Sequence, residues 1–466
     1  MKNKRVEKDM LGKILLPENA YYGAQTQRAR ENFPFDHPKQ HLEYIYATVI
    51  IKKAAAKVNN ILGLLDKKKA DAIISACDEI LNGSFDQEFI VSPYQAGAGT
   101  SHNMNVNEVI ANRSNEILGA PLGTYKYIHP NDHVNMSQST NDVIPAAIRI
   151  ASLTLLPKLL ANIKNLEKAF SDKGKEFADI VKPGRTHLRD ALPVTLGQEF
   201  TAYQAAIARD RQRINMAQEF LRSLGIGGTA VGTGINTHPK YHAFMISELK
   251  CLTNLPLVSC RNLFEPMQNM ADFLNLSGTF RILAQTLVRI GNDLRLLSSG
   301  PGTGINEISL PEMQPGSSIM PGKVNPSIIE MLTMVCYQII GYDQAIFLSS
   351  ISGQLELNVM LPLIAYDLLE QIKLLTKAIA VFEKKCLSGI TANRQMCQWW
   401  FEKGVGLGAI LNPIIGYEKA ATLVKEALTT HQSIKNLAIK KGYLTKKQEA
   451  LFSPKNLTRP NIRNEK

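Results

Sequence analysis

Four short segments combine glycine with Thr, Ser, Asn, His or Lys, at places where a helical protein would prefer helix formers. They are residues 97–103 (GAGTSHN), 138–142 (QSTND), 184–188 (GRTHL) and 316–326 (GSSIMPGKVNP). Hydroxyl and amide side chains donate hydrogen bonds to carboxylate oxygens. A lysine adds a charge-assisted hydrogen bond. Together the four segments predict a pocket that binds carboxylates.

Each segment taken alone has a plain structural explanation. Ser139, Thr140 and Asn141 are typical of a cap on the helix that follows them. A single Thr-His pair is more often a structural turn, and a glycine-rich loop is more often a turn than a phosphate cradle. The sequence contains neither a Walker pattern nor a dinucleotide fingerprint, and it has no HExxH motif. We therefore expect neither a cofactor nor a metal ion.

The elements that must position these segments are long helices, which dominate from about residue 142 to 395. One apolar stripe alternates spacings of three and four residues, as in a heptad repeat, and comprises Phe273, Leu276, Phe280, Leu283, Leu287, Ile290, Leu294 and Leu297. A second apolar face comprises Leu155, Leu156, Leu159, Leu160, Ile163, Leu166 and Phe170. Alternating strand patterns are few. The sequence predicts an all-α protein with a central bundle of long helices, which pack on one another or on a partner subunit.

Residues 300–322 form a long connection between two helical regions and are rich in glycine and proline. A connection of this length in a compact protein is usually functional or disordered. The segment is neither highly charged nor poor in apolar residues, so disorder is the weaker interpretation. We expect a mobile loop or lid over the site.

Composition restricts the class of protein. The chain has 466 residues and a net charge of +12. Residues 435–466 hold nine Lys or Arg and two Glu, which accounts for seven of these charges. A basic end of this kind is more often a solvated surface than a nucleic-acid site, and a positive protein also attracts a dianionic substrate. The six cysteines form no CxxC pair. With no signal peptide and no apolar run near the ~20 residues of a membrane helix, the sequence predicts a cytoplasmic protein that binds neither nucleic acid nor membrane.

Three of the segments resemble the signature motifs of the aspartase/fumarase superfamily: GSSIMPGKVNP at 316–326, GRTHLRDALPVTLGQEF at 184–200 and QSTND at 138–142. The similarity extends from YYGAQTQR (21–28) to ALFSPKNL (450–457). This resemblance implies a β-eliminating lyase that releases fumarate from a small dicarboxylic acid. It further implies three domains, here 1–140, 141–395 and 396–466, and a homotetramer with a twenty-helix core whose active sites each combine three subunits.

The resemblance also assigns roles to residues. Ser317 aligns with the general base, which removes a proton from the carbon next to one carboxylate and leaves an aci-carboxylate, a carbanion whose charge lies on the carboxylate oxygens. A serine is a poor base unless its alkoxide is stabilised. Thr100, Ser139 and Thr140 match the positions that hold this carboxylate, and Ser101 lies beside them as a further donor.

The remaining matched positions serve the other end of the substrate. Three of them grip the second carboxylate: Thr186, Lys323 and Asn325. Asn141 and His187 match positions near the leaving group, with His187 either essential or only tuning the rate. Glu330 matches the carboxylate that orients this histidine. Tyr22, Arg28 and Glu307 fall in matching stretches, where we expect structural roles.

Two branches of the superfamily fit best. GAGTS (97–101) and QSTND resemble the aspartate ammonia-lyases, whereas YYGAQTQR, IHPND (128–132) and GGTAVGTGINTHP (227–239) resemble the class II fumarases. Since Ser101 and Thr140 belong to the expected pocket, we favour L-aspartate, giving fumarate and ammonia. The alternatives are L-malate and a non-catalytic scaffold. Two positions depart from the pattern: Gly302 stands where the family generally has Arg, and Leu361 where aspartases commonly have Glu.

Overall fold

The computed structural model describes residues 4–445 and 454–460, and the chain there is mostly helical. The long helices are α2 (Leu42–Ile61), α5 (Thr140–Glu176), α6 (Leu196–Phe220), α9 (Ala271–Leu297), α10 (Ser327–Ser350) and α11 (Leu361–Lys385). The shorter helices are α1 (Ala24–Asn32), α3 (Lys67–Leu81), α4 (Thr100–Ile117), α7 (Tyr241–Thr253), α8 (Glu265–Gln268), α12 (Arg394–Lys403), α13 (Leu407–Ile415), α14 (Tyr417–Thr430), α15 (Ile434–Lys440) and α16 (Pro454–Leu457). The strands form small two-stranded sheets: β1 (Lys4–Asp9) with β2 (Gly12–Pro17), β3 (Val181–Thr186) with β4 (Arg189–Thr195), β5 (Ser223–Leu224) with β6 (Val258–Ser259), and β7 (Ile308–Ser309) with β8 (Thr391–Ala392).

The chain divides into two compact units. Unit 1 comprises residues 1–160, 212–284 and 337–376, and unit 2 comprises residues 161–211, 285–336 and 377–466. The boundaries between the two units fall within long helices. The three domains that the resemblance implies stay a prediction. The heptad stripe on α9 is confirmed, because each of its eight apolar side chains is buried. Of the seven apolar residues predicted for the face on α5, five are buried: Leu156, Leu159, Ile163, Leu166 and Phe170.

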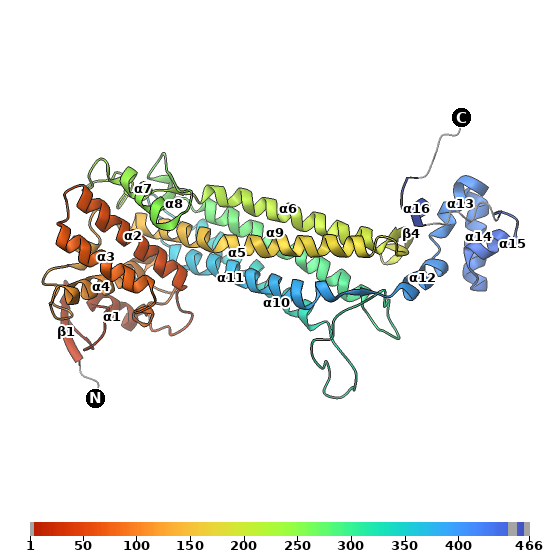
Figure 1. Cartoon of the computed structure of the whole chain (residues 1–466), viewed down its shortest axis with the longest axis horizontal. Coiled ribbons are helices and arrows are strands. Elements are labelled where there is room, and N and C mark those ends of the chain that lie inside the picture. Colours follow the sequence, from red (N-terminus) through yellow and green to blue (C-terminus); the bar gives the residue numbers. More distant parts are fainter. Residues whose placement is uncertain (1–3, 446–453, 461–466) are drawn as a thin grey trace. The chain divides into compact units, whose positions relative to one another are not determined.

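In unit 1, α2, α3 and α4 pack against one another (Figure 1). They share an apolar core drawn from residues 14–134, which includes Val49, Ile73 and Val106. Helix α3 begins where the side chain of Asp66 accepts a hydrogen bond from Lys69 N at 3.0 Å, a standard N-cap. Helix α4 departs from the usual pattern, since many of its buried side chains are polar, among them Asn103, Asn107 and Glu108.

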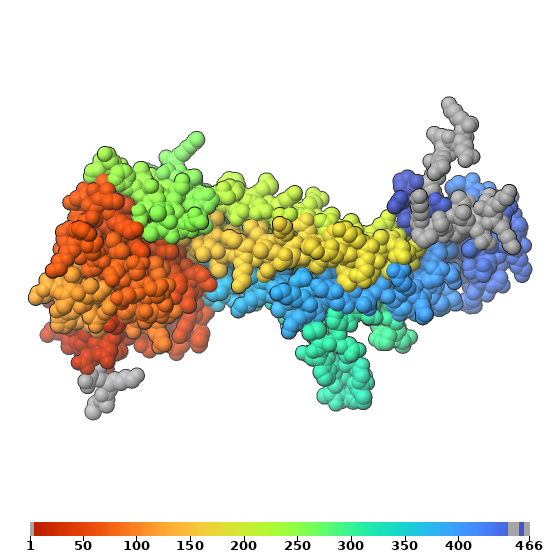
Figure 2. Space-filling view, viewed as in Figure 1, coloured from red at the N-terminus to blue at the C-terminus, as the bar shows by residue number. Residues whose placement is uncertain are grey.

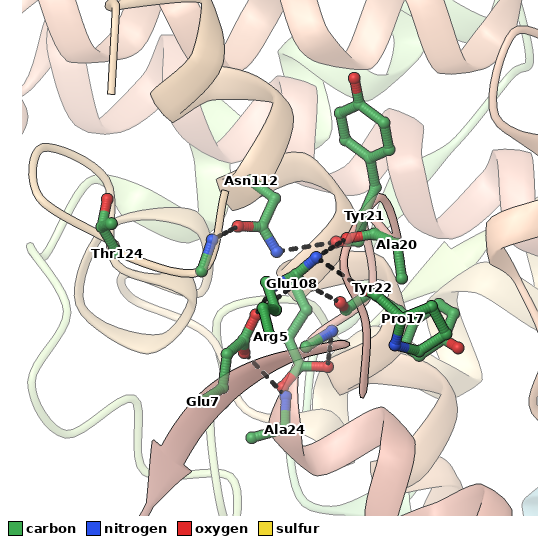
Figure 3. A network of polar contacts seen from close by, with 12 residues as sticks. Arg5, Glu7, Pro17, Ala20, Tyr21, Tyr22, Ala24, Glu108, Asn112 and Thr124 are labelled. Carbon is green, nitrogen blue, oxygen red and sulfur yellow. Dashed lines mark hydrogen bonds and ion pairs between the residues drawn. The ribbon is translucent and has the colours of Figure 1, made fainter. Parts of the chain in front are cut away.

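A buried polar network fixes the N-terminal hairpin to α1 and α4 (Figure 3). Glu108 accepts hydrogen bonds from Gly23 N, Gln25 N and Thr26 N at 2.9, 2.9 and 3.1 Å, and another from the Thr26 hydroxyl at 2.6 Å. These donors lie at the start of α1, where a carboxylate is stabilised by the helix dipole. Arg28, farther along α1, pairs with Asp9 of β1. Burial raises the pKa of Glu108 to about 7, against the lowering effect of its donors.

Unit 2 contains the β3–β4 hairpin, an aromatic cluster and the C-terminal helices. Phe170, Phe177, Phe200 and Tyr203 stack edge to face or at a tilt. Helices α13, α14 and α15 enclose a separate apolar core drawn from residues 407–444. The segment between α9 and α10 is a long loop interrupted only by β7, and its teal lobe stands out from the surface in Figure 2. The stretch ALFSPKNL (450–457), where the similarity to the superfamily ends, lies partly outside the described residues.

Two helices are long and apolar enough to cross a membrane by length and composition, α5 and α10. In α5, 72% of the apolar window is buried inside the protein, so α5 is a core helix. In α10 only 28% of the window is buried. Its exposed apolar side chains include Met334, Tyr337 and Leu348, which are 64%, 59% and 59% exposed. Within residues 4–445 and 454–460, these side chains of α10 are therefore left without an apolar partner.

Candidate active site

The QSTND segment forms the start of α5. Ser139 precedes the helix, and its hydroxyl accepts a hydrogen bond from Asn141 N at 3.3 Å. The Asp142 carboxylate reaches back to Ser139 N at 2.9 Å. This reciprocal pair is a capping box with aspartate in the third position. The structural explanation of the segment is therefore correct, and the cap also fixes the direction in which Thr140 and its neighbours face.

Asp142 also anchors the glycine-rich stretch 225–234 to this helix start. Its second oxygen accepts hydrogen bonds from Gly227 N at 2.9 Å and Thr229 N at 3.0 Å. The Asn141 amide donates to Ala230 O at 2.8 Å. Burial raises the pKa of Asp142 to about 6, while its three backbone donors and Lys52 act to lower it. The fumarase-like stretch at 227–239 thus scaffolds the segment that carries Thr140.

Thr100 and Ser101 open α4, whose start lies beside that of α5. The chain enters α4 through Gly99, whose φ of +88° suits glycine. A side chain at Gly99 would contact Ile144 of α5 at 3.0 Å. The Asn103 amide donates to the Thr140 hydroxyl at 3.1 Å and joins the two helices directly. Unit 1 therefore brings together Thr100, Ser101, Ser139, Thr140 and Asn141 around two helix N-termini, which favour bound anions.

Ser317 lies in a tight turn in the loop before α10. Its hydroxyl oxygen accepts hydrogen bonds from Ile319 N at 3.1 Å and Met320 N at 2.9 Å. Two backbone donors on one oxygen are the arrangement that stabilises an oxyanion. The turn is closed by Gly316 N, which donates to Lys323 O at 2.8 Å, and by the Asn325 amide, which donates to Gly316 O at 2.8 Å. The signature segment thus holds Ser317, Lys323 and Asn325 in one closed loop.

Thr186 and His187 lie at the tip of the β3–β4 hairpin. Thr186 pairs with Arg189, and the two residues between them, His187 and Leu188, have φ values of +54° and +57°. Positive φ at both central positions is the conformation of a type I′ hairpin turn. The Thr186 and His187 side chains are exposed. The hairpin therefore presents a hydroxyl and an imidazole to a ligand or to another subunit.

The base of this hairpin is fixed to the start of the Ser317 loop. Glu307 is fully buried and receives both nitrogens of the Arg185 fork, at 2.8 and 3.1 Å. Lys182 Nζ lies 2.8 Å from the same carboxylate. Bidentate pairing of this kind fixes geometry as well as charge. Glu307 thus has the structural role expected of it, since it ties the loop to the strand that carries Thr186.

The predicted residues fall into two sets. The unit 1 set is Thr100, Ser101, Ser139, Thr140 and Asn141, and the unit 2 set is Thr186, His187, Ser317, Lys323, Asn325 and Glu330. In the described part of unit 2, no hydrogen bond joins the hairpin tip to the Ser317 loop, and none joins Glu330 to His187. Lys323 is exposed and Glu330 is half-buried.

Three residues that sequence reasoning missed lie directly behind Thr140. Lys52 of α2 is buried and donates to Asn135 Oδ1 at 2.8 Å. Asn103 Nδ2 also donates to Asn135 Oδ1, at 3.3 Å. Lys52 follows a run of apolar residues and precedes Lys53, so its sequence context resembles that of a solvated lysine. Only the packing of α2 against α4 and the 130–139 segment places it at the site.

Three histidine pairs have a four-residue spacing: 37/41, 129/133 and 238/242. Within residues 4–445 and 454–460, however, no three His, Cys, Asp or Glu side chains are arranged to hold a metal ion. Leu361 is fully buried at the start of α11. Gly302 is exposed, and a Cβ there would meet nothing within 4 Å.

Comparisons with known proteins show which family the chain belongs to. The sequence profile described as Lyase matches residues 12–341, and the profile described as Fumarase C C-terminus matches residues 409–459. An aspartate ammonia-lyase from Helicobacter pylori is 46% identical over 459 residues, covering 98% of both chains. A class II fumarate hydratase from Neisseria meningitidis is 44% identical over 460 residues, covering 98% of this chain and 100% of that protein. A crystal structure of fumarate lyase:delta crystallin from Brucella melitensis superimposes with a TM-score of 0.95 at 44% identity, covering 98% of this chain and 100% of the other.

The mostly helical fold and the family matches identify an enzyme of the lyase class. The chain belongs to the aspartase/fumarase superfamily.

Proposed function

We propose that this enzyme is an aspartate ammonia-lyase, which converts L-aspartate to fumarate and ammonia. In the proposed reaction the Ser317 alkoxide takes a proton from C3 of the substrate. The electron pair left on C3 moves into the adjacent carboxylate and gives the aci-carboxylate. It then returns to form the C2–C3 double bond as the C2–N bond breaks and ammonia leaves.

The proposal rests above all on the turn around Ser317. A serine hydroxyl is a weak base, so proton abstraction needs strong stabilisation of the alkoxide. The hydrogen bonds from Ile319 N and Met320 N to the Ser317 oxygen supply donors of the required kind. This is the single observation that carries the elimination chemistry.

The unit 1 set is suited to the carboxylate that gains charge. Thr100, Ser101, Ser139 and Thr140 offer hydroxyl groups at the N-termini of α4 and α5. Hydrogen bonds from these groups strengthen as the second negative charge develops, which lowers the barrier rather than merely tightening binding. Asn141 lies next to them, close to where the amino group would leave.

The unit 2 set is suited to the other carboxylate and to the leaving group. Lys323 supplies a cation and Asn325 an amide from the Ser317 loop, and Thr186 adds a hydroxyl from the hairpin tip. His187 would meet the departing ammonia, with Glu330 orienting its ring. In this proposal Glu330 and His187 approach one another across subunits.

We further propose that the enzyme is a homotetramer whose subunits share active sites, and that it is located in the cytoplasm. The exposed apolar positions on α10 recur at spacings typical of a helix-bundle seam, with Met334, Tyr337 and Leu348 on one face. A face of this kind on a single chain marks a protein interface. Closed symmetry would bring hairpin tips, Ser317 loops and α5 starts from different copies together. Six free thiols, most of them buried, suit a reducing compartment.

The second candidate is class II fumarase, which releases water from L-malate. It is favoured by the small difference in identity, 44% to a fumarase against 46% to an aspartase. The stretch at 227–239 also resembles fumarases, but it contacts the site through the backbone and through Asp142. Ser101 and Thr140 belong to the proposed carboxylate pocket, and their residue types favour aspartate. A non-catalytic scaffold would not need the full set of donors.

The test is ultraviolet detection of fumarate after purified protein is added to L-aspartate and, separately, to L-malate. We expect fumarate from aspartate alone. Fumarate from malate alone would replace this proposal with the fumarase. If neither substrate gave fumarate, the elimination chemistry would be disproved for both. Ser317→Ala serves as the control for a contaminating lyase, since it must abolish the signal.

A further inference from the structure

Lys52 is a buried cation without a carboxylate partner. Its side chain is fully buried in unit 1, and its Nζ donates to Asn135 Oδ1 at 2.8 Å. Among the described residues no carboxylate lies within ion-pairing distance of this nitrogen. Burying an unpaired charge is costly. Lys52 lies beside a predicted carboxylate site, so a bound substrate anion is suited to stabilise its charged form.

Asn135 connects this ammonium group to the site. Its Oδ1 accepts hydrogen bonds from Lys52, from Asn107 Nδ2 at 3.2 Å and from Asn103 Nδ2 at 3.3 Å. The amide of Asn103 then donates to the Thr140 hydroxyl at 3.1 Å. A chain of three hydrogen bonds thus leads from Lys52 to Thr140. Because Lys52 and Asn103 donate to the same oxygen, Lys52 fixes the orientation of the Asn135 amide and, through it, that of the Asn103 amide.

The direction of the last bond determines what Thr140 can do. Its hydroxyl oxygen accepts the proton of Asn103, so its own proton is available for donation. In the part of the chain that the structure describes, no protein group accepts that proton. Thr140 lies at the first position of α5, where the helix dipole also favours an anion. The hydroxyl is therefore set as a donor toward a ligand oxygen.

We propose that Lys52 is a positioning residue that orients the Thr140 hydroxyl through Asn135 and Asn103 and adds positive potential to the carboxylate subsite in which charge develops. This inference rests on the proposed elimination and names the source of its electrostatic stabilisation. Lys52 does not touch the substrate. It acts on the difference between the bound dicarboxylate and the aci-carboxylate, which carries one more negative charge at this end.

The electrostatic surroundings of Lys52 agree with this role. Burial lowers the pKa of Lys52 to about 7, while Asp142 of α5 and Cys77 of α3 act in the opposite direction. The neighbouring His102 of α4 is held neutral, because burial and the charge of Lys52 lower its pKa to about 3. A substrate anion arriving at Thr140 would favour the charged form of the lysine. The charged form of Lys52 and the negative charge that develops on the substrate carboxylate therefore stabilise one another.

The experiment compares wild type, Lys52→Met and Lys52→Arg with two inhibitors. Succinate imitates the bound dicarboxylate, and deprotonated 3-nitropropionate carries the charge distribution of the aci-carboxylate. In Lys52→Met we expect kcat to fall at least about tenfold, with KM changed much less. The affinity for the nitronate should fall by a similar factor, while the affinity for succinate is nearly kept. Lys52→Arg should recover part of both losses.

The matched control is Lys53→Met, on the next residue of α2, which pairs with Asp78 outside this chain of hydrogen bonds. Lys53→Met should leave the affinities for both inhibitors unchanged. If Lys52→Met fails to fold, Asn103→Leu interrupts the chain while keeping the lysine, and the same selective loss is expected. If Lys52→Met lost affinity for succinate and for the nitronate by the same factor, or kept the wild-type kcat, the inference would be overturned. A wild-type enzyme that forms no fumarate would instead disprove the proposed function, and the inference with it.

Discussion

In the proposed elimination Ser317 meets the largest chemical demand, because an ordinary alcohol would have to act as a base. Ser317→Ala removes the oxygen that the backbone donors of Ile319 and Met320 surround. We expect turnover to become undetectable in the fumarate assay. Binding of succinate and the assembly of subunits should persist, since the loop is closed by Gly316 and Asn325 rather than by Ser317. Near-normal turnover in Ser317→Ala would exclude this residue as the base.

Lys52 should leave a signature in the pH dependence of stability. Its pKa falls from the usual 10.5 to about 7 in the folded protein. Between these values the unfolded chain binds one more proton than the folded chain. The free energy of unfolding therefore rises with pH there, by about 1.4 kcal/mol per pH unit. We expect Lys52→Met to lack this rise, and Lys53→Met to keep it.

The measurement is the urea midpoint of unfolding for wild type and both variants at several pH values from 7.5 to about 9.5. This range lies between the folded and unfolded pKa values of Lys52. The charged and titratable neighbours of Lys52 are Asp142, Cys77 and His102, and none of them is removed by the substitution. Curves for wild type and Lys52→Met that run parallel would show that Lys52 does not titrate in this window.

At the level of residues, sequence reasoning found the groups expected to contact substrate and missed those behind them. Ser317, Thr140 and Thr186 lie in contiguous motifs rich in hydroxyl groups and glycine. Lys52 and Asn135 are 83 residues apart and carry no local signal. Their role depends on which face of α2 is buried, and two adjacent lysines on one helix do not reveal this. The buried asparagines of α4 are invisible for the same reason.

At the level of elements, the loop before α10 depends on glycine at particular positions. A Cβ at Gly304 would overlap the carbonyl group of Ser299, whereas a Cβ at Gly302 would meet nothing within 4 Å. We expect Gly304→Ala to displace the loop, to lower turnover by about an order of magnitude and to speed proteolysis between α9 and α10. Gly302→Ala is the matched control and should change neither. Equal effects of the two substitutions would show that the backbone of this loop is not restrained as the structure has it.

The elements themselves differ in how far the sequence predicts them. The α9 stripe is confirmed because eight apolar residues at heptad spacing leave little choice of buried face. The β3–β4 hairpin was seen only as a polar, glycine-bearing segment. Its register is set by the shift between Pro183 and Arg185 and by the ties of Lys182 and Arg185 to Glu307. Because Glu307 lies 122 residues from Arg185, no local pattern could reveal this anchor.

At the level of the whole molecule, the single chain leaves features that a partner copy would complete. Among the described residues, Met334, Tyr337 and Leu348 leave an apolar face of α10 exposed. A monomer would expose this face to water at considerable cost. The same chain carries all the predicted site residues, yet in two sets on separate units. The proposed tetramer, in which each site combines residues of three subunits, would account for both observations.

Shared sites predict that two inactive variants restore one another. Ser317→Ala removes the proposed base, and Thr186→Ala removes a donor on the hairpin tip. If each site takes these residues from different subunits, co-expressed mixed assemblies contain some sites built from two intact copies. With random mixing about a quarter of the sites are intact, so activity in the fumarate assay should rise well above that of either parent. Mixed assemblies can be isolated through two different affinity tags, one on each variant. If they stay as inactive as the parents, Ser317 and Thr186 of one site must come from a single chain.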